Sequence, residues 1–121
     1  GTYGLSNGLL DTPWPKLVRT RTRFAALLDS RAVDDAPVDA LLALLHDRSP
    51  APDHELPDTG LGRERERFLS SPFIVGRDYG TRSTSVLAYD ADGRLVATER
   101  SYAPDGRAVE TLRFEPQDTP A

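Results

Sequence analysis

Apolar residues recur at helical spacing in two stretches of the first half of the chain. The first runs from about residue 16 to 31 and the second from about 37 to 47. Spacings of three and four residues place these side chains on one face of a helix. Asp34, Asp35 and Pro37 form a typical helix N-terminus before the second stretch. The apolar positions are Leu17, Phe24, Leu27, Leu28, Val38, Leu41, Leu42 and Leu45.

The last third of the chain changes to β-branched and aromatic residues with turn signals between them. This pattern predicts strands joined by short turns, which form an antiparallel meander. Tyr3 with Leu5, and the run 73–75, predict two further short strands. The long strands are expected at 81–89, 95–102 and 108–115, with turns at 90–93 and 104–106.

Between the helices and the strands, residues 49–62 are rich in proline and glycine and predict a long loop. Residues 63–68 alternate in charge and predict a single helical turn. Helices grouped beside a meander indicate an α+β domain with two helices on a mainly antiparallel sheet. A chain of 121 residues is the size of one domain.

Composition narrows the function classes. The net charge of −4 argues against a general nucleic-acid surface. No window is apolar enough to span a bilayer. Cysteine is absent, which excludes disulfides, thiolate catalysis and cysteine metal sites from this chain. We therefore expect no metal site and a cytoplasmic location. Residues 1–5 alternate between apolar and small side chains, with no leader segment before them. A chain that opens directly on such a strand-like pattern is expected to be a piece of a larger domain.

Three groups of polar side chains are candidates for chemistry. His46 and His54 lie at a helix end and in the long loop, where histidine is usually structural. Lys16, Arg19 and Arg23 share one helix face and could meet an anion, although a solvated face is the ordinary interpretation.

Asn7 and Arg82 are the most specific of the candidates. Asn7 follows a predicted strand, and Arg82 starts another strand after Gly80. An asparagine amide can donate to an oxyanion, and an arginine can hold a carboxylate in a fixed fork. A turn asparagine and an exposed strand arginine are the alternatives that these residues leave open.

Five ordered segments and one pair carry a resemblance to a known family. The chain resembles the C-terminal half of the family named for its Asn-Arg-Asp-Glu motif, the family of transport and Golgi organisation protein 2. The segments are Tyr3-Gly-Leu-Ser-Asn7, Leu10-Asp-Thr-Pro-Trp-Pro-Lys16, Leu56-Pro-Asp-Thr-Gly60, Leu69-Ser-Ser71 with Phe73-Ile74, and Tyr79-Gly-Thr-Arg-Ser83, and the pair is Glu99-Arg100.

This resemblance implies half of a four-layer αββα fold like that of N-terminal-nucleophile hydrolases. The family's cysteine after the initiator methionine and its Asn-Arg-Asp-Glu motif belong to the other half and are missing here. Residues 1–121 then form the C-terminal part of such a domain, with a helical part at about 16–48, the loop 49–62 and the meander at about 73–115. Related cysteine hydrolases, including the choloylglycine hydrolases, imply supporting catalytic roles for Asn7 and Arg82.

The resemblance also implies a function. Family members are implicated in haem trafficking, in handling acyl-coenzyme A or lipids, and in secretory-pathway organisation. We therefore expect binding or trafficking of haem or a similar amphipathic metabolite, with Trp14, Tyr79 and Arg82 as ligand-binding residues and no required cofactor. Haem could be held by His46 or His54, or by an apolar cleft and a propionate–arginine pair. The alternative is an amide or thioester hydrolase whose cysteine lies on the missing half. The expected partners are that half, or a second copy of the chain.

Overall fold

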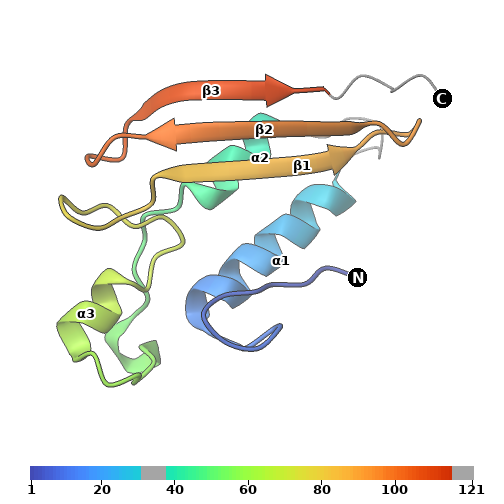
Figure 1. Ribbon diagram of the computed structural model, residues 1–121. Coiled ribbons are helices and arrows are strands. Elements are labelled where there is room, and N and C mark those ends of the chain that lie inside the picture. The colour runs from blue at the N-terminus through green and yellow to red at the C-terminus, as the bar shows by residue number, and fades with distance from the viewer. Residues whose placement is uncertain (31–37, 116–121) are drawn as a thin grey trace.

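A computed structural model describes residues 1–30 and 38–115. Its helices lie on one side of a three-stranded antiparallel sheet of order β1-β2-β3, which confirms the expected α+β class (Figure 1). One short 3-10 turn, Asp53–Glu55, interrupts the long loop. The elements are α1 (Pro15–Asp29), α2 (Val38–Leu45), α3 (Arg63–Phe68), β1 (Ser83–Tyr89), β2 (Leu95–Tyr102) and β3 (Ala108–Phe114).

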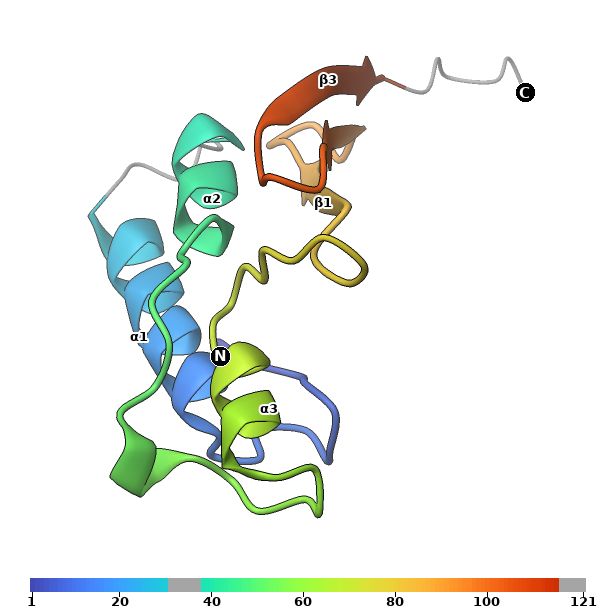
Figure 2. The same ribbon diagram turned by 90° about the vertical axis from the view of Figure 1, so that its left-hand side faces the viewer.

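The two predicted helices form the layer beneath the sheet. α1 starts at Pro15, because proline's fixed φ suits the first helical position. α2 contacts both α1 and β1, and so lies between α1 and the sheet (Figure 2). Its Leu42 is only 1% exposed and Leu17 of α1 is also buried, as the helical spacing predicts. The predicted helix start at 34–37 lies outside the described residues.

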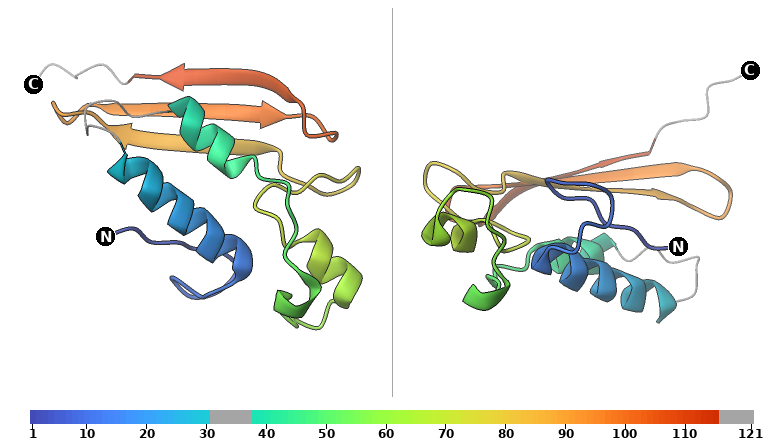
Figure 3. Two further views of the ribbon diagram at one scale, coloured as in Figure 1. Left: turned by 180° about the vertical axis from the view of Figure 1, so that it is seen from behind. Right: turned by 90° about the horizontal axis from the view of Figure 1, so that it is seen from below.

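The inner face of the sheet is covered over β1 and β2, whereas β3 is exposed along its length and the outer face is open. Val86 pairs with Thr98 on the inner face, and both are buried against the helical layer. On the outer face Leu87, Ala97 and Phe114 are in register, and Leu87 and Phe114 are 68% and 56% exposed. Viewed from below, the helices lie on one side of the sheet, and no other part of residues 1–30 and 38–115 covers its outer face (Figure 3).

An aromatic cluster joins the end of α2 to the sheet. The Phe73 ring centroid lies 4.2 Å from that of His46 and 4.7 Å from that of Tyr102. Burial and the nearby Arg48 charge lower the pKa of His46, because both disfavour the protonated ring. His46 therefore packs in this aromatic cluster, the structural role that the sequence interpretation gave it.

Two predicted short strands are wrong. Tyr3 and Leu5 are extended but exposed, and the segment is held by Asp11, whose carboxylate accepts from Gly4 N–H at 2.8 Å. Residues 73–75 are irregular because their backbone bonds to loops: Phe73 N–H donates to the carbonyl of Asp47 at 2.8 Å. In both cases the short apolar pattern alone does not make a strand, because a strand also needs a neighbouring strand that the described residues do not place there.

The basic stripe on α1 is only partly solvated, because Arg23 is exposed while Lys16 and Arg19 are half-buried. Arg19 and Arg23 both reach the carboxylate of Asp47, at 3.1 and 2.9 Å. These contacts tie α1 to the segment after α2. Burial raises the pKa of Asp47, but hydrogen bonds from Ser49 and then the charges of Arg19 and Arg23 outweigh burial and lower it. Lys16, the third member of the stripe, takes a different direction and points to the end of α3.

Candidate functional site

A hollow of about 290 Å³ lies where the start of α1 meets α3 and the loops around it. Its lining includes Asn7, Trp14, Lys16, Glu66 and Tyr79, and we name it the polar pocket. An amide, an indole, an amine, a carboxylate and a phenol thus surround one small space. Such a mixture of aromatic surface and a few polar groups is typical of ligand sites.

Three of the four residues singled out from the sequence meet in this pocket. Asn7, Trp14 and Tyr79 come from separate segments and line it together. Arg82 is not among its lining residues. The Arg82 guanidinium is exposed and donates to the carbonyl of Gly76 at 3.2 Å, so it braces the loop that carries Tyr79.

Lys16 is the strongest electrostatic feature of the polar pocket. Its ammonium is half-buried and donates to the carbonyl of Leu69 at 2.9 Å. Burial lowers the pKa of this lysine, because the low-dielectric surroundings disfavour its charge. Our sequence interpretation placed Lys16 on a solvated face. The one sequence signal that distinguished Lys16 from the other basic residues of α1 was its place at the end of the family-like segment Leu10–Lys16.

Glu66 forms the opposite kind of feature, a buried carboxylate that is already satisfied. It is 5% exposed and accepts hydrogen bonds from both the N–H and the hydroxyl of Thr59. These donors lower the pKa of Glu66, because they favour the ionised form. The contact holds the loop before α3 as one wall of the polar pocket. From sequence, Glu66 was only one member of the charge-alternating run 63–68.

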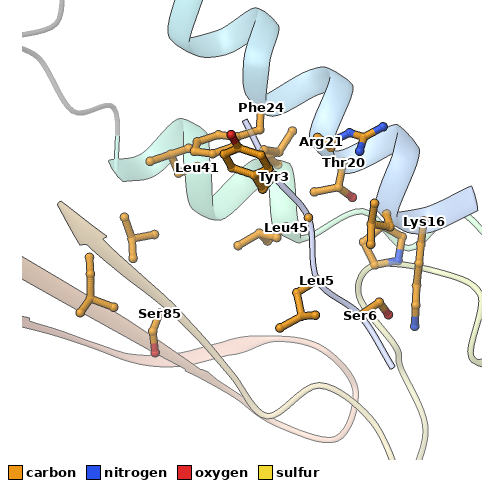
Figure 4. A pocket seen from close by; sticks show the side chains of 16 residues that line it. Tyr3, Leu5, Ser6, Lys16, Thr20, Arg21, Phe24, Leu41, Leu45 and Ser85 are labelled. Carbon is orange, nitrogen blue, oxygen red and sulfur yellow. The ribbon is translucent and has the colours of Figure 1, made fainter. Parts of the chain in front are cut away.

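A second hollow, of about 460 Å³, adjoins the first. It lies between the N-terminal segment, the two main helices and the edge of β1, and we name it the apolar groove. Figure 4 shows Tyr3, Phe24 and Leu41 toward one end of it, with Ser6 and Lys16 at the other. Lys16 lines both hollows.

Neither histidine is placed to hold haem iron in these hollows. His46 is packed between Phe73 and Tyr102, and His54 is exposed with its ring 3.7 Å from the Glu55 carboxylate. Neither lines the polar pocket or the apolar groove. Within residues 1–30 and 38–115 no three His, Cys, Asp or Glu side chains gather as a metal site would require. A haem in these hollows would therefore be held by aromatic and charged contacts.

The structure thus defines an α+β fold with two adjoining hollows, of which the apolar groove reaches β1 and the polar pocket lies among α1, α3 and the loops. Residues 1–104 match the family model described as Transport and Golgi organisation 2. The chain belongs to this family. No helix among the described residues is long and apolar enough to cross a membrane.

Curated relatives carry the same family name. The transport and Golgi organization protein 2 homolog of Bos taurus is 40% identical over 108 residues, which cover 84% of this chain and 38% of the relative. The Homo sapiens homolog is 38% identical with the same coverage, and the Mus musculus homolog is 32% identical over 95% of this chain and 44% of the relative. The chain spans less than half the length of these relatives.

Proposed function

We propose that this protein binds or carries haem or a similar amphipathic metabolite, and that the polar pocket takes part in binding. The observation that carries the proposal is the convergence of Asn7, Trp14 and Tyr79 beside Lys16, next to an apolar groove. Aromatic rings supply flat apolar contact, and the amide and amine supply polar contact to the same ligand. Membership of a family named for transport supports the proposal.

A hemin titration tests this function. The measurement uses the natural full-length gene product, or this chain co-expressed with the polypeptide that matches the rest of the relatives. We expect a shift of the hemin absorbance band at micromolar concentration, and about tenfold weaker binding for Trp14→Ala, because one stacked ring contributes roughly 0.5–1.5 kcal/mol beyond its buried area. Tyr89→Ala, at an exposed strand end, is the control. No spectral change with the wild type would overturn the proposal.

The open sheet face supports a proposal about partners. We propose that the remainder of an αββα domain, or a second copy of this chain, covers the outer face around Leu87 and Phe114. An exposed apolar strand surface and free strand edges favour association. We expect the isolated chain to self-associate in light scattering, and Phe114→Glu to reduce that association. A stable wild-type monomer with a cooperative melt would contradict this proposal.

A hydrolase remains the second candidate function, because Asn7 lies in the polar pocket where an amide could donate to an oxyanion. In this proposal the nucleophile is a cysteine on the rest of the domain. Arg82→Ala in the full-length protein should then abolish turnover of an acyl thioester or amide. Unchanged turnover would remove Arg82 from the mechanism.

A cytoplasmic location stays a prediction, which imaging of the tagged protein would check.

A further inference from the structure

We infer that Lys16 binds the anionic head group of an elongated amphipathic ligand, whose head lies in the polar pocket and whose apolar body lies in the apolar groove. The inference rests on the proposed function and specifies its ligand as a carboxylate attached to a hydrocarbon or ring system. It also assigns one residue, Lys16, the role of selecting acids over neutral analogues.

The geometry that carries this inference is the position of Lys16 between the two hollows. Its side chain lines both, and the N-terminal segment runs along both, with residues 3–6 at the groove and Asn7 at the pocket. Figure 4 shows Lys16 beside Ser6 at the end of the groove, away from the apolar side chains around Phe24. A ligand that follows the N-terminal segment therefore passes the ammonium group.

The two hollows differ in size, and the surface of both is mostly apolar. The polar pocket measures about 290 Å³, near the lower limit of roughly 300 Å³ for ligand sites, and so suits a head group. The apolar groove measures about 460 Å³ and is lined by leucines from α2 together with Leu5 and Leu87. An amphipathic ligand is best accommodated by the two hollows together, with its head group in the polar pocket and its apolar body in the apolar groove.

The charge of Lys16 lacks a counter-ion within residues 1–30 and 38–115. Its one hydrogen bond goes to the neutral carbonyl of Leu69, whereas Arg21, which also lines the groove, is paired with the Asp11 carboxylate at 2.9 Å. Burial removes part of the hydration of this cation, and one hydrogen bond to a neutral carbonyl supplies no opposite charge. Lys16 also stands in the first turn of α1, where the helix dipole disfavours a cation. A bound anion would offset both costs.

Glu66 is the one carboxylate that lines the polar pocket, and it does not neutralise Lys16 by direct contact. No ion pair within 4.0 Å joins the two among the described residues, and the Glu66 carboxylate accepts from Thr59 instead. The pocket therefore holds a satisfied carboxylate and an unpaired ammonium. This arrangement leaves Lys16 as the group that attracts a ligand carboxylate.

Lys16 is the only lysine in the sequence, all other basic side chains being arginine or histidine. Amine-specific labelling of this chain therefore reports on Lys16 and the N-terminal amine alone. This makes the contact directly measurable without a substitution.

The test compares a fluorescent polyene fatty acid, cis-parinaric acid, with its methyl ester. We expect the wild type to bind the acid at least about tenfold more tightly than the ester, since hydrogen bonds to charged groups contribute roughly 1.5–3 kcal/mol. Lys16→Met should remove that preference by weakening acid binding, and Lys16→Arg should keep most of it. Arg94→Met is the control, an exposed cation that lines neither hollow, and should leave the preference unchanged. Circular dichroism melts show whether each variant folds.

Labelling gives a second readout that needs no variant. The acid should protect Lys16 from reductive methylation, mapped by mass spectrometry, whereas the ester should protect it less. Equal binding of acid and ester with no effect of Lys16→Met would overturn the inference while leaving the proposed binding function intact. If neither cis-parinaric acid, its ester nor hemin binds the wild type, the proposed function fails and the inference fails with it.

Discussion

Phe73→Ala is expected to lower the free energy of unfolding by about 3–5 kcal/mol, the usual cost of truncating a buried phenylalanine. Phe73 is 1% exposed and stands edge-on to Tyr102 while also contacting the ring of His46. Removing its ring leaves a cavity between the end of α2 and the sheet. Because whole domains are stable by only about 5–15 kcal/mol, this one change should bring the chain close to unfolding at room temperature.

Urea denaturation followed by far-ultraviolet circular dichroism measures this effect. Phe114→Ala is the matched control, since it removes the same ring from a position that is 56% exposed. We expect its midpoint to move little at protein concentrations low enough to limit association. Similar midpoints for the two variants would show that the aromatic cluster does not hold the helical layer to the sheet.

Gly76→Ala is expected to disrupt the loop that carries Tyr79. A Cβ at residue 76 would clash with the backbone oxygen of Tyr79 and would lie 2.7 Å from the ring of Phe68. The loop is closed by Thr81, whose N–H donates to the Ile74 carbonyl at 2.8 Å, so the backbone oxygen has little room to retreat. Overpacking of this kind typically costs about 1–3 kcal/mol, and here it also displaces a wall of the polar pocket.

The expected result for Gly76→Ala is therefore a lower melting temperature together with weaker ligand binding. Thermal melts and the hemin titration measure the two effects on the same samples. Asp78→Ala, at an exposed position in the same loop, should change neither. If Gly76→Ala melts and binds as the wild type does, the loop accommodates a side chain at residue 76 and Tyr79 is not fixed by it.

The local elements of this protein follow from short-range patterns. α1 and α2 match the stretches with helical spacing, because one apolar face per helix is enough to predict them. The β1–β2 turn follows from its glycine, since Gly93 adopts a φ of 79° that other residues avoid. Where only a short apolar pattern was available, the alternation of Tyr3 with Leu5 and the run 73–75, it predicted strands that the structure does not contain.

In the candidate site, too, the sequence marked individual residues but did not predict which of them lie together. Asn7, Trp14 and Tyr79 were marked by their sequence segments, but nothing in those segments shows that they share a pocket. Arg82 was marked as strongly and stands outside it, bonded to the carbonyl of Gly76. Lys16 and Glu66 were given ordinary surface roles, because a charged residue on a helix usually faces water.

The sequence by itself therefore determined the helices, the meander with its turns, and the family resemblance, all of which depend on residues close together in the chain or on motif order. Only the tertiary structure decided where Lys16 lies, because its bond to Leu69 joins residues 53 positions apart. Only the tertiary structure set the pocket beside the groove, since both arise where the N-terminal segment meets α1 and more distant parts of the chain. Long-range contacts of this kind depend on how faces pack together, and no local pattern records them.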